Sequence, residues 1–116
     1  MIAILIMKQY VIDELRPDDY KKLKAYLDEN FNSSDIDGIY WIPFEQENLT
    51  DIQAGHTECQ PFYFAIELNP DILACELLVR TKNRVRCDCI GYATEKQLSW
   101  LIGFLDGIFN KLEIIT

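Results

Sequence analysis

The sequence lacks any apolar run long enough to cross a membrane, and it is poor in basic residues. The apolar opening run, residues 1–7, is far shorter than the roughly 20 residues that a membrane helix needs. It also has no basic start and no small-residue cleavage site, so it does not resemble a secretory signal. With 11 Lys and Arg against 19 Asp and Glu, the formal net charge is −8, which repels nucleic-acid phosphates and anionic lipids. We therefore expect a cytoplasmic protein that binds neither nucleic acids nor membranes.

Internal repeats, low-complexity tracts and Gly/Ser-rich linkers are also absent. The 116 residues are 49% hydrophobic, as is typical of one packed domain. No Gly-rich turn joins a strand to a helix, so no nucleotide-binding crevice is expected. Motifs of hydrolases, kinases and zinc proteases do not occur. We expect a single α+β domain over residues 1–116 without a cofactor, and we favour a protein that is not an enzyme.

Two segments have the periodicity of amphipathic helices. The first begins at Pro17 and is expected over residues 17–31, with apolar residues every three or four positions. The second begins with a capping box from Thr94 to Gln97 and is expected to reach about Leu112. A further capping box, from Thr50 to Gln53, predicts one or two helical turns towards His56.

The remaining apolar segments alternate as strands do. Strands are expected around residues 10–12, over 39–42 and over 62–69, followed by a turn at Pro70 and a three-residue loop at 82–84. The expected cross-strand pairs are Leu68–Leu73, Ile66–Cys75, Phe64–Leu77, Val79–Cys87 and Leu77–Cys89. The order β-α-β-β-β-β-α predicts an α+β two-layer sandwich, with a mostly antiparallel sheet and two main helices on one face.

The last predicted helix has more apolar surface than one sheet face can cover. Trp100 and Phe104 lie beyond the core stripe, and Gly103 and Gly107 beside them would allow another element to approach closely. That element is either the first helix of the same chain or the same helix of a second subunit, and we favour the second subunit because two-fold dimers are common. The leading functional hypothesis is therefore a cytosolic interaction or regulatory module that forms a homodimer or binds another protein, through this surface or the outer sheet face.

Basic residues gather at the tip of the last predicted hairpin. Arg80, Arg84 and Arg86 lie there in an otherwise acidic chain. Arginine forks bind carboxylates and phosphates, so this tip is a candidate site for an acidic partner. The alternative is that the charges protect a hairpin end and an edge strand from aggregation.

A metal or thiol site is the first alternative function. His56, Cys59, Cys87 and Cys89 together provide the Cys₃His set that zinc accepts. Their spacing lacks the usual C-x₂₋₄-C pair, however, so we favour the interpretation that Cys75, Cys87 and Cys89 are reduced core residues without a metal.

A small-ligand site is the second alternative. Tyr40, Trp41 and Phe44 gather aromatic side chains at the start of the irregular segment of residues 40–60. Such residues line ligand pockets, which would suit a small-ligand binder or an enzyme. They also cap core edges, which is the interpretation that we favour.

Overall fold

The computed structural model describes residues 9–31, 37–81 and 91–115. Its strands are β1 (Gln9–Ile12), β2 (Ile39–Pro43), β3 (Phe62–Asn69), β4 (Ile72–Glu76) and β5 (Arg80–Thr81). The helices are α1 (Pro17–Asn30), α2 (Asp51–Gly55) and α3 (Glu95–Lys111), with short 3₁₀ turns η2 (Gln46–Asn48) and η3 (Thr57–Cys59). None of the described helices combines the length and the apolar character that crossing a membrane requires.

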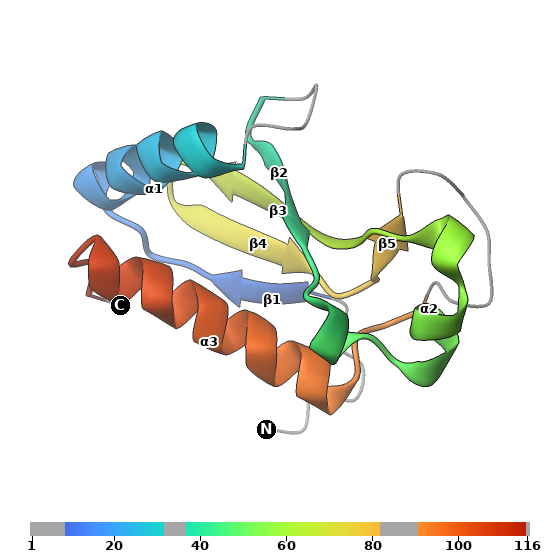
Figure 1. Cartoon of the computed structure of the whole chain (residues 1–116). Helices are drawn as coiled ribbons and strands as arrows, with labels where there is room; N and C mark the ends of the chain where they lie inside the picture. Colours follow the sequence, from blue (N-terminus) through green and yellow to red (C-terminus); the bar gives the residue numbers. More distant parts are fainter. Residues whose placement is uncertain (1–8, 32–36, 82–90, 116) are drawn as a thin grey trace.

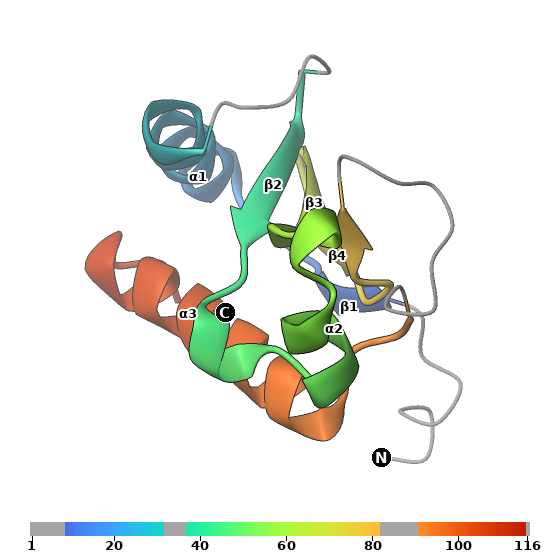
Figure 2. The ribbon, with the colours of Figure 1, turned by 45° about the vertical axis from the view of Figure 1, so that its right-hand side comes forward.

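The strands form one antiparallel sheet in the order β1-β4-β3-β2, and β5 pairs with β3. Both long helices lie on the same side of this sheet (Figures 1 and 2). Alternate residues of β3, from Phe62 to Leu68, are buried against the helices, and their neighbours face the other side. The predicted α+β two-layer sandwich is thereby confirmed.

Local sequence signals determine where the helices begin. The two predicted capping boxes are present, because Thr50 Oγ1 accepts from Gln53 N at 3.2 Å and Thr94 Oγ1 accepts from Gln97 N at 3.2 Å. Gln97 Nε2 also donates to Gln53 Oε1 at 2.9 Å and to the carbonyl oxygen of Asn48 at 2.9 Å. The first turns of α2 and α3 are therefore joined by one buried amide.

The register of the first predicted hairpin is confirmed in its main part. Leu68 lies opposite Leu73 and Ile66 lies opposite Cys75. The predicted pair Phe64–Leu77 is wrong, because β4 ends at Glu76 and the chain pairs with β3 again only at β5. There Phe62 lies opposite Thr81, which is a shift of two residues relative to β4. A shift of two keeps every side chain on its own face, so the alternation of apolar residues continues through it.

The second predicted hairpin register is also wrong. Val79 N donates to the carbonyl of Gly91 at 2.9 Å, and Ala93 N donates to the carbonyl of Leu77 at 2.7 Å. Val79 and Leu77 therefore lie opposite residues 91–93 instead of Cys87 and Cys89. This shift is again an even number of residues. Both registers keep the same side chains on each face of the sheet, so an alternating pattern cannot distinguish them. The predicted loop at 82–84 lies outside the described residues.

Candidate functional site: the groove between β1 and α3

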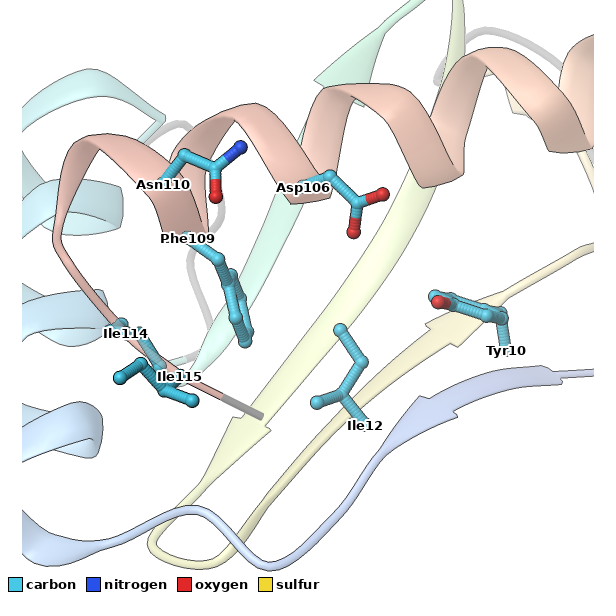
Figure 3. Close-up of a pocket in the computed structure, with 7 residues that line it drawn as sticks. All are labelled: Tyr10, Ile12, Asp106, Phe109, Asn110, Ile114 and Ile115. Carbon is cyan, nitrogen blue, oxygen red and sulfur yellow. The ribbon is translucent and has the colours of Figure 1, made fainter.

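A groove runs along β1 at the edge of the sheet. It consists of two hollows of about 400 and 550 Å³, which share Tyr10, Ile12 and Ile115. The first lies between β1 and α3 and is also lined by Asp106, Phe109, Asn110 and Ile114 (Figure 3). The second continues past the end of β1 and is also lined by Val11, Asp13, Glu14 and Arg16. Because the hollows share residues, they form one trough along the strand.

The β1 wall follows from strand alternation. Tyr10 and Ile12 lie opposite Cys75 and Leu73, whose side chains are buried in the core. Their side chains therefore face the helix layer, while Val11 faces the other side and is 43% exposed. Residues two apart on a strand share a face, so Tyr10 and Ile12 form a continuous side of the groove.

The opposite wall comes from the end of α3 and from the chain that follows it. Ile114 N donates to the carbonyl of Phe109 at 2.9 Å, and Glu113 N donates to that of Asn110 at 3.2 Å. These two bonds form a Schellman motif, whose turn residue is Glu113 with φ of 58°. The turn returns the chain alongside β1, so Ile114 packs into the core and Ile115 remains 83% exposed beside the groove.

The backbone edge of β1 that faces away from β4 lies beside this groove. Leu15 N donates to the carbonyl of Asp71 at 3.0 Å. The backbone groups of odd-numbered residues in β4 and just before it therefore point towards β1. Backbone direction alternates along an antiparallel pair, so Tyr10 and Ile12 point to β4. The N–H and C=O groups of Gln9 and Val11 therefore point away from the sheet, where no strand of the described chain pairs with them.

The groove is negatively charged. Asp13, Glu14 and Asp106 line it, and Arg16 is the basic residue among its lining side chains. Arg16 is already engaged, since its Nε lies 3.0 Å from Asp19 Oδ2. The hydrogen bonds from the Arg16 side chain and backbone lower the pKa of the Asp19 carboxyl below its usual value. The three groove carboxylates therefore dominate the local field.

Tyr10 and Asp106 face each other across the groove. The carboxylate of Asp106 points from α3 towards the side of Tyr10, while Phe109 points towards Ile12 (Figure 3). Burial, and then the negative charge of Asp106, raise the pKa of Tyr10 above its usual value. The phenol is therefore protonated at neutral pH, and its hydroxyl group serves as a donor.

The chemistry of the groove suits recognition more than reaction. The seven residues in Figure 3 comprise four apolar side chains, a phenol, a carboxylate and an amide, with no His, Cys or Lys among them. This set offers no base beside a nucleophile, which covalent catalysis needs. Apolar side chains together with a few polar groups are instead what a binding site requires for affinity and orientation.

The Trp100–Phe104 surface that was predicted to need a partner is largely covered by the chain itself. The Phe104 ring lies 5.8 Å from that of Phe31, which directly follows α1, and 5.2 Å from that of Trp100. Trp100 also lies 6.2 Å from Phe44 and 6.5 Å from Phe64, measured between ring centroids. The structure thus packs these residues against the sheet and against the end of α1. This contact lies within one chain, as in the first of the two predicted alternatives.

Gly103 and Gly107 lie on the exposed side of α3. An added Cβ at either position would meet nothing within 4 Å, so within the described chain nothing approaches these glycines closely. The proposed second subunit at this surface stays a prediction.

The three aromatic residues of the predicted ligand pocket lie on both faces of the sheet. Tyr40 is buried on the helix side of the sheet, where its hydroxyl group donates to Asp28 Oδ1 at 2.5 Å, and burial together with this bond raises the pKa of Tyr40 to about 12. Trp41 lies on the other face, 5.6 Å from the ring of Tyr63. Phe44 packs against Phe64 at 4.5 Å. Tyr40 and Phe44 thus behave as core residues.

The structure describes two of the four residues of the predicted metal site, His56 and Cys59. Cys59, three residues after His56, is buried, and its N donates to the carbonyl of His56 at 3.0 Å. Cys87 and Cys89 lie outside the described residues. Among the residues that the structure does describe, no three His, Cys, Asp or Glu side chains form a group that could hold a metal ion. The hypothesis that these four residues bind zinc stays untested.

Of the remaining cysteine and arginine residues with a predicted role, the structure describes Cys75 and Arg80. Cys75 is fully buried as predicted, and burial raises the pKa of its thiol to about 12, so the thiol is unreactive. Arg80 forms an ion pair with Glu76. Arg84 and Arg86 lie outside the described residues, so the structure does not test the basic cluster.

Sequence reasoning missed the groove itself. Tyr10 and Ile12 were assigned only to a strand, and Asp106 and Asn110 were given no role. The usable signal was the apolar pair Ile114 and Ile115, which follows the predicted end of the last helix and belongs to no amphipathic stripe.

Comparisons with protein-family models, with curated proteins and with solved structures found no match to this chain. The groove and its chemistry therefore carry the functional argument.

Proposed function

We propose that the protein is an interaction module that binds an extended polypeptide segment as an additional strand on β1, in the groove between β1 and α3. The observation that carries this proposal is the outward-facing backbone edge of Gln9 and Val11 beside a groove lined by both apolar and polar side chains. In β-strand addition, main-chain hydrogen bonds supply affinity, and pockets for alternate side chains supply specificity. The β1 edge provides the first, and the hollows along it provide the second.

The shape of the groove favours a segment of chain over a small molecule. Small-ligand sites bury most of the ligand surface, whereas this trough follows the strand and continues past its end to Arg16. Exposed Val11 and Ile115 lie on its borders. A bound strand would cover both side chains, which resolves an otherwise unfavourable exposure of apolar surface.

A second copy of the chain fits this site less well than a different partner. Two-fold pairing of β1 with itself would place two negatively charged grooves side by side, and like charges at an interface oppose association. We therefore propose a heterotypic partner, and we place the complex in the cytoplasm, where thiols such as that of Cys75 stay reduced.

The test selects binders from a displayed library of random ten-residue segments, using the wild type and two variants of Val11. Val11→Pro removes the outward N–H, whereas Val11→Thr keeps it and keeps a strand-forming residue. We expect selected segments to bind the wild type and Val11→Thr, and to bind Val11→Pro at least tenfold more weakly.

Amide hydrogen exchange keeps the test decisive if Val11→Pro fails to fold. In the wild type, a selected segment should slow exchange at the Gln9 and Val11 amides, because both become hydrogen-bonded. Bound segments that leave these two amides unchanged, or a selection that enriches nothing, would overturn the proposal.

A further inference from the structure

Resting on the proposed strand addition, we infer that the bound segment is cationic and has an alternating pattern. An apolar residue faces Ile12, and a Lys or Arg two positions away faces Tyr10 and Asp106. The partner is then a basic segment of extended chain. Three features of the groove support this partner, namely its two unlike ends, its spacing and its unpaired charge.

The groove has an apolar end and a polar end. Around Ile12, its walls are Phe109, Ile114 and Ile115, whereas Asp106 lies towards Tyr10 (Figure 3). A side chain entering at Ile12 therefore meets hydrocarbon on several sides. A side chain entering at Tyr10 meets a carboxylate and the edge of a phenol.

The spacing of the two ends matches that of a strand. Tyr10 and Ile12 are two residues apart on β1 and share a face, and an added strand presents its own side chains to that face at the same interval. The residue between the apolar and basic positions faces the other side, next to Val11. The predicted pattern is therefore apolar-x-basic in one strand direction and basic-x-apolar in the other.

The groove carboxylates have no cation in the described chain. Its ion pairs join Arg16 to Asp19, Lys24 to Asp28 and to Asp37, and Arg80 to Glu76. Asp106, Asp13 and Glu14 belong to none of them, and the one basic lining residue is bound elsewhere. A partner cation would therefore supply the missing charge.

The chain's own β1 cannot supply it. Its sequence from Gln9 to Ile12 contains no basic residue, so self-pairing would place a neutral side chain at the Asp106 position. Charge complementarity thus distinguishes a basic partner segment from a second copy.

The test uses seven-residue peptides with blocked ends. The probe is Ser-Thr-Ile-Thr-Arg-Thr-Ser, together with the peptide in which Ile and Arg are exchanged, so that both strand directions are covered. One control carries Glu in place of Arg, and another has the same composition with Ile and Arg adjacent. Affinities are measured by calorimetry at about 50 mM salt, because ion pairs at a surface are screened at higher salt.

We expect the better Arg probe to bind at least tenfold more tightly than its Glu counterpart and than the adjacent-residue control. In Asp106→Asn the preference for Arg over Glu should fall below threefold. The matched control Asp51→Asn makes the same charge change on α2, away from the groove residues, and should retain the full preference.

The outcomes separate this inference from the proposed function. If segments protect the Gln9 and Val11 amides but show no preference for Arg, or keep that preference in Asp106→Asn, strand addition stands and the cationic pattern is wrong. If no peptide or library segment protects these amides, both are wrong. Dimer formation that protects the same amides without peptide would overturn the inference in favour of a second copy.

Discussion

The two halves of α3 meet the rest of the molecule in different ways. In the first half, Gln97 joins a buried hydrogen-bond network, and Trp100 stacks on aromatic rings from the sheet and from the segment after β2. In the second half, Asp106 and Asn110 face a hollow of about 400 Å³ beside β1. One half is filled by the chain itself, while the other leaves room for something else.

What lies across from the helix explains this difference. The first half faces large aromatic residues, Phe44 and Phe64, whereas the polar flank of the second half faces the four-residue edge strand β1. This short edge strand contributes few side chains, and no strand of the described residues lies beyond it to supply more. The amphipathic pattern of a helix therefore predicts which residues turn inward, but not whether the facing layer covers them.

A cavity at Leu101 should cause the largest loss of stability. Leu101 is fully buried in the filled half, so Leu101→Ala should lower the free energy of unfolding by about 2–5 kcal/mol. The exposed Asp106 borders the open half, and Asp106→Ala should change it by no more than about 0.5 kcal/mol. Urea unfolding measures both, and equal losses would contradict the division of α3 into filled and open halves.

Breaking the buried amide network should give the next largest effect. Gln97→Met conserves the shape of the side chain but removes the donor to Gln53 Oε1 and to Asn48 O, and should cost about 1–3 kcal/mol. The neighbouring Lys96 bonds Glu47 O at the surface, so Lys96→Met is a matched control with a change within about 0.5 kcal/mol. If both variants melt at the same temperature, the network does not stabilise the filled half.

Relieving the turn after α3 should stabilise the protein slightly. Glu113 has φ of 58°, a conformation that glycine adopts at no steric cost. We expect Glu113→Gly to raise the free energy of unfolding by about 0.5–1 kcal/mol. The control Lys111→Gly places glycine within the helix and should lower the stability by about 1 kcal/mol. A loss of stability in Glu113→Gly would show that this turn is not strained.

The smallest expected effect is a change in the titration of one tyrosine. Because Asp106 contributes to raising the pKa of Tyr10, Asp106→Asn should lower that pKa towards its usual value. Burial is the larger cause, so part of the elevation should remain. Isotope-labelled tyrosine followed by NMR, with Tyr10→Phe to assign the signal, reports this shift. An unchanged Tyr10 titration would place Asp106 farther from Tyr10 than the groove geometry requires.

Sequence reasoning succeeded where structure is local. The start of α1 at Pro17 and the capping boxes at Thr50 and Thr94 depend on residues within one turn, and each helix begins where these signals indicate. The pairing of Ile66 with Cys75 was also accessible, because the turn at Pro70 fixes the register of the strands beside it.

It failed where alternation was the only guide. Leu77 and Val79 keep their inward orientation whether they pair with residues 87–89 or with 91–93, because both registers have the same parity. The groove could not be predicted from the sequence for a related reason. Nothing in the residues of β1 indicates that β4 is its neighbour, and without that neighbour the free edge beside α3 cannot be located.

The amide of Gln97 has a consequence for how the segment between β2 and β3 tolerates change in length. This segment has the composition of a loop, which is ordinarily where insertions are accepted. Here a single side chain holds two acceptors, Asn48 O and Gln53 Oε1, on either side of one short stretch. An insertion between residues 48 and 53 would move one acceptor away from the other, so this stretch should accept substitutions at its exposed positions but no added residues.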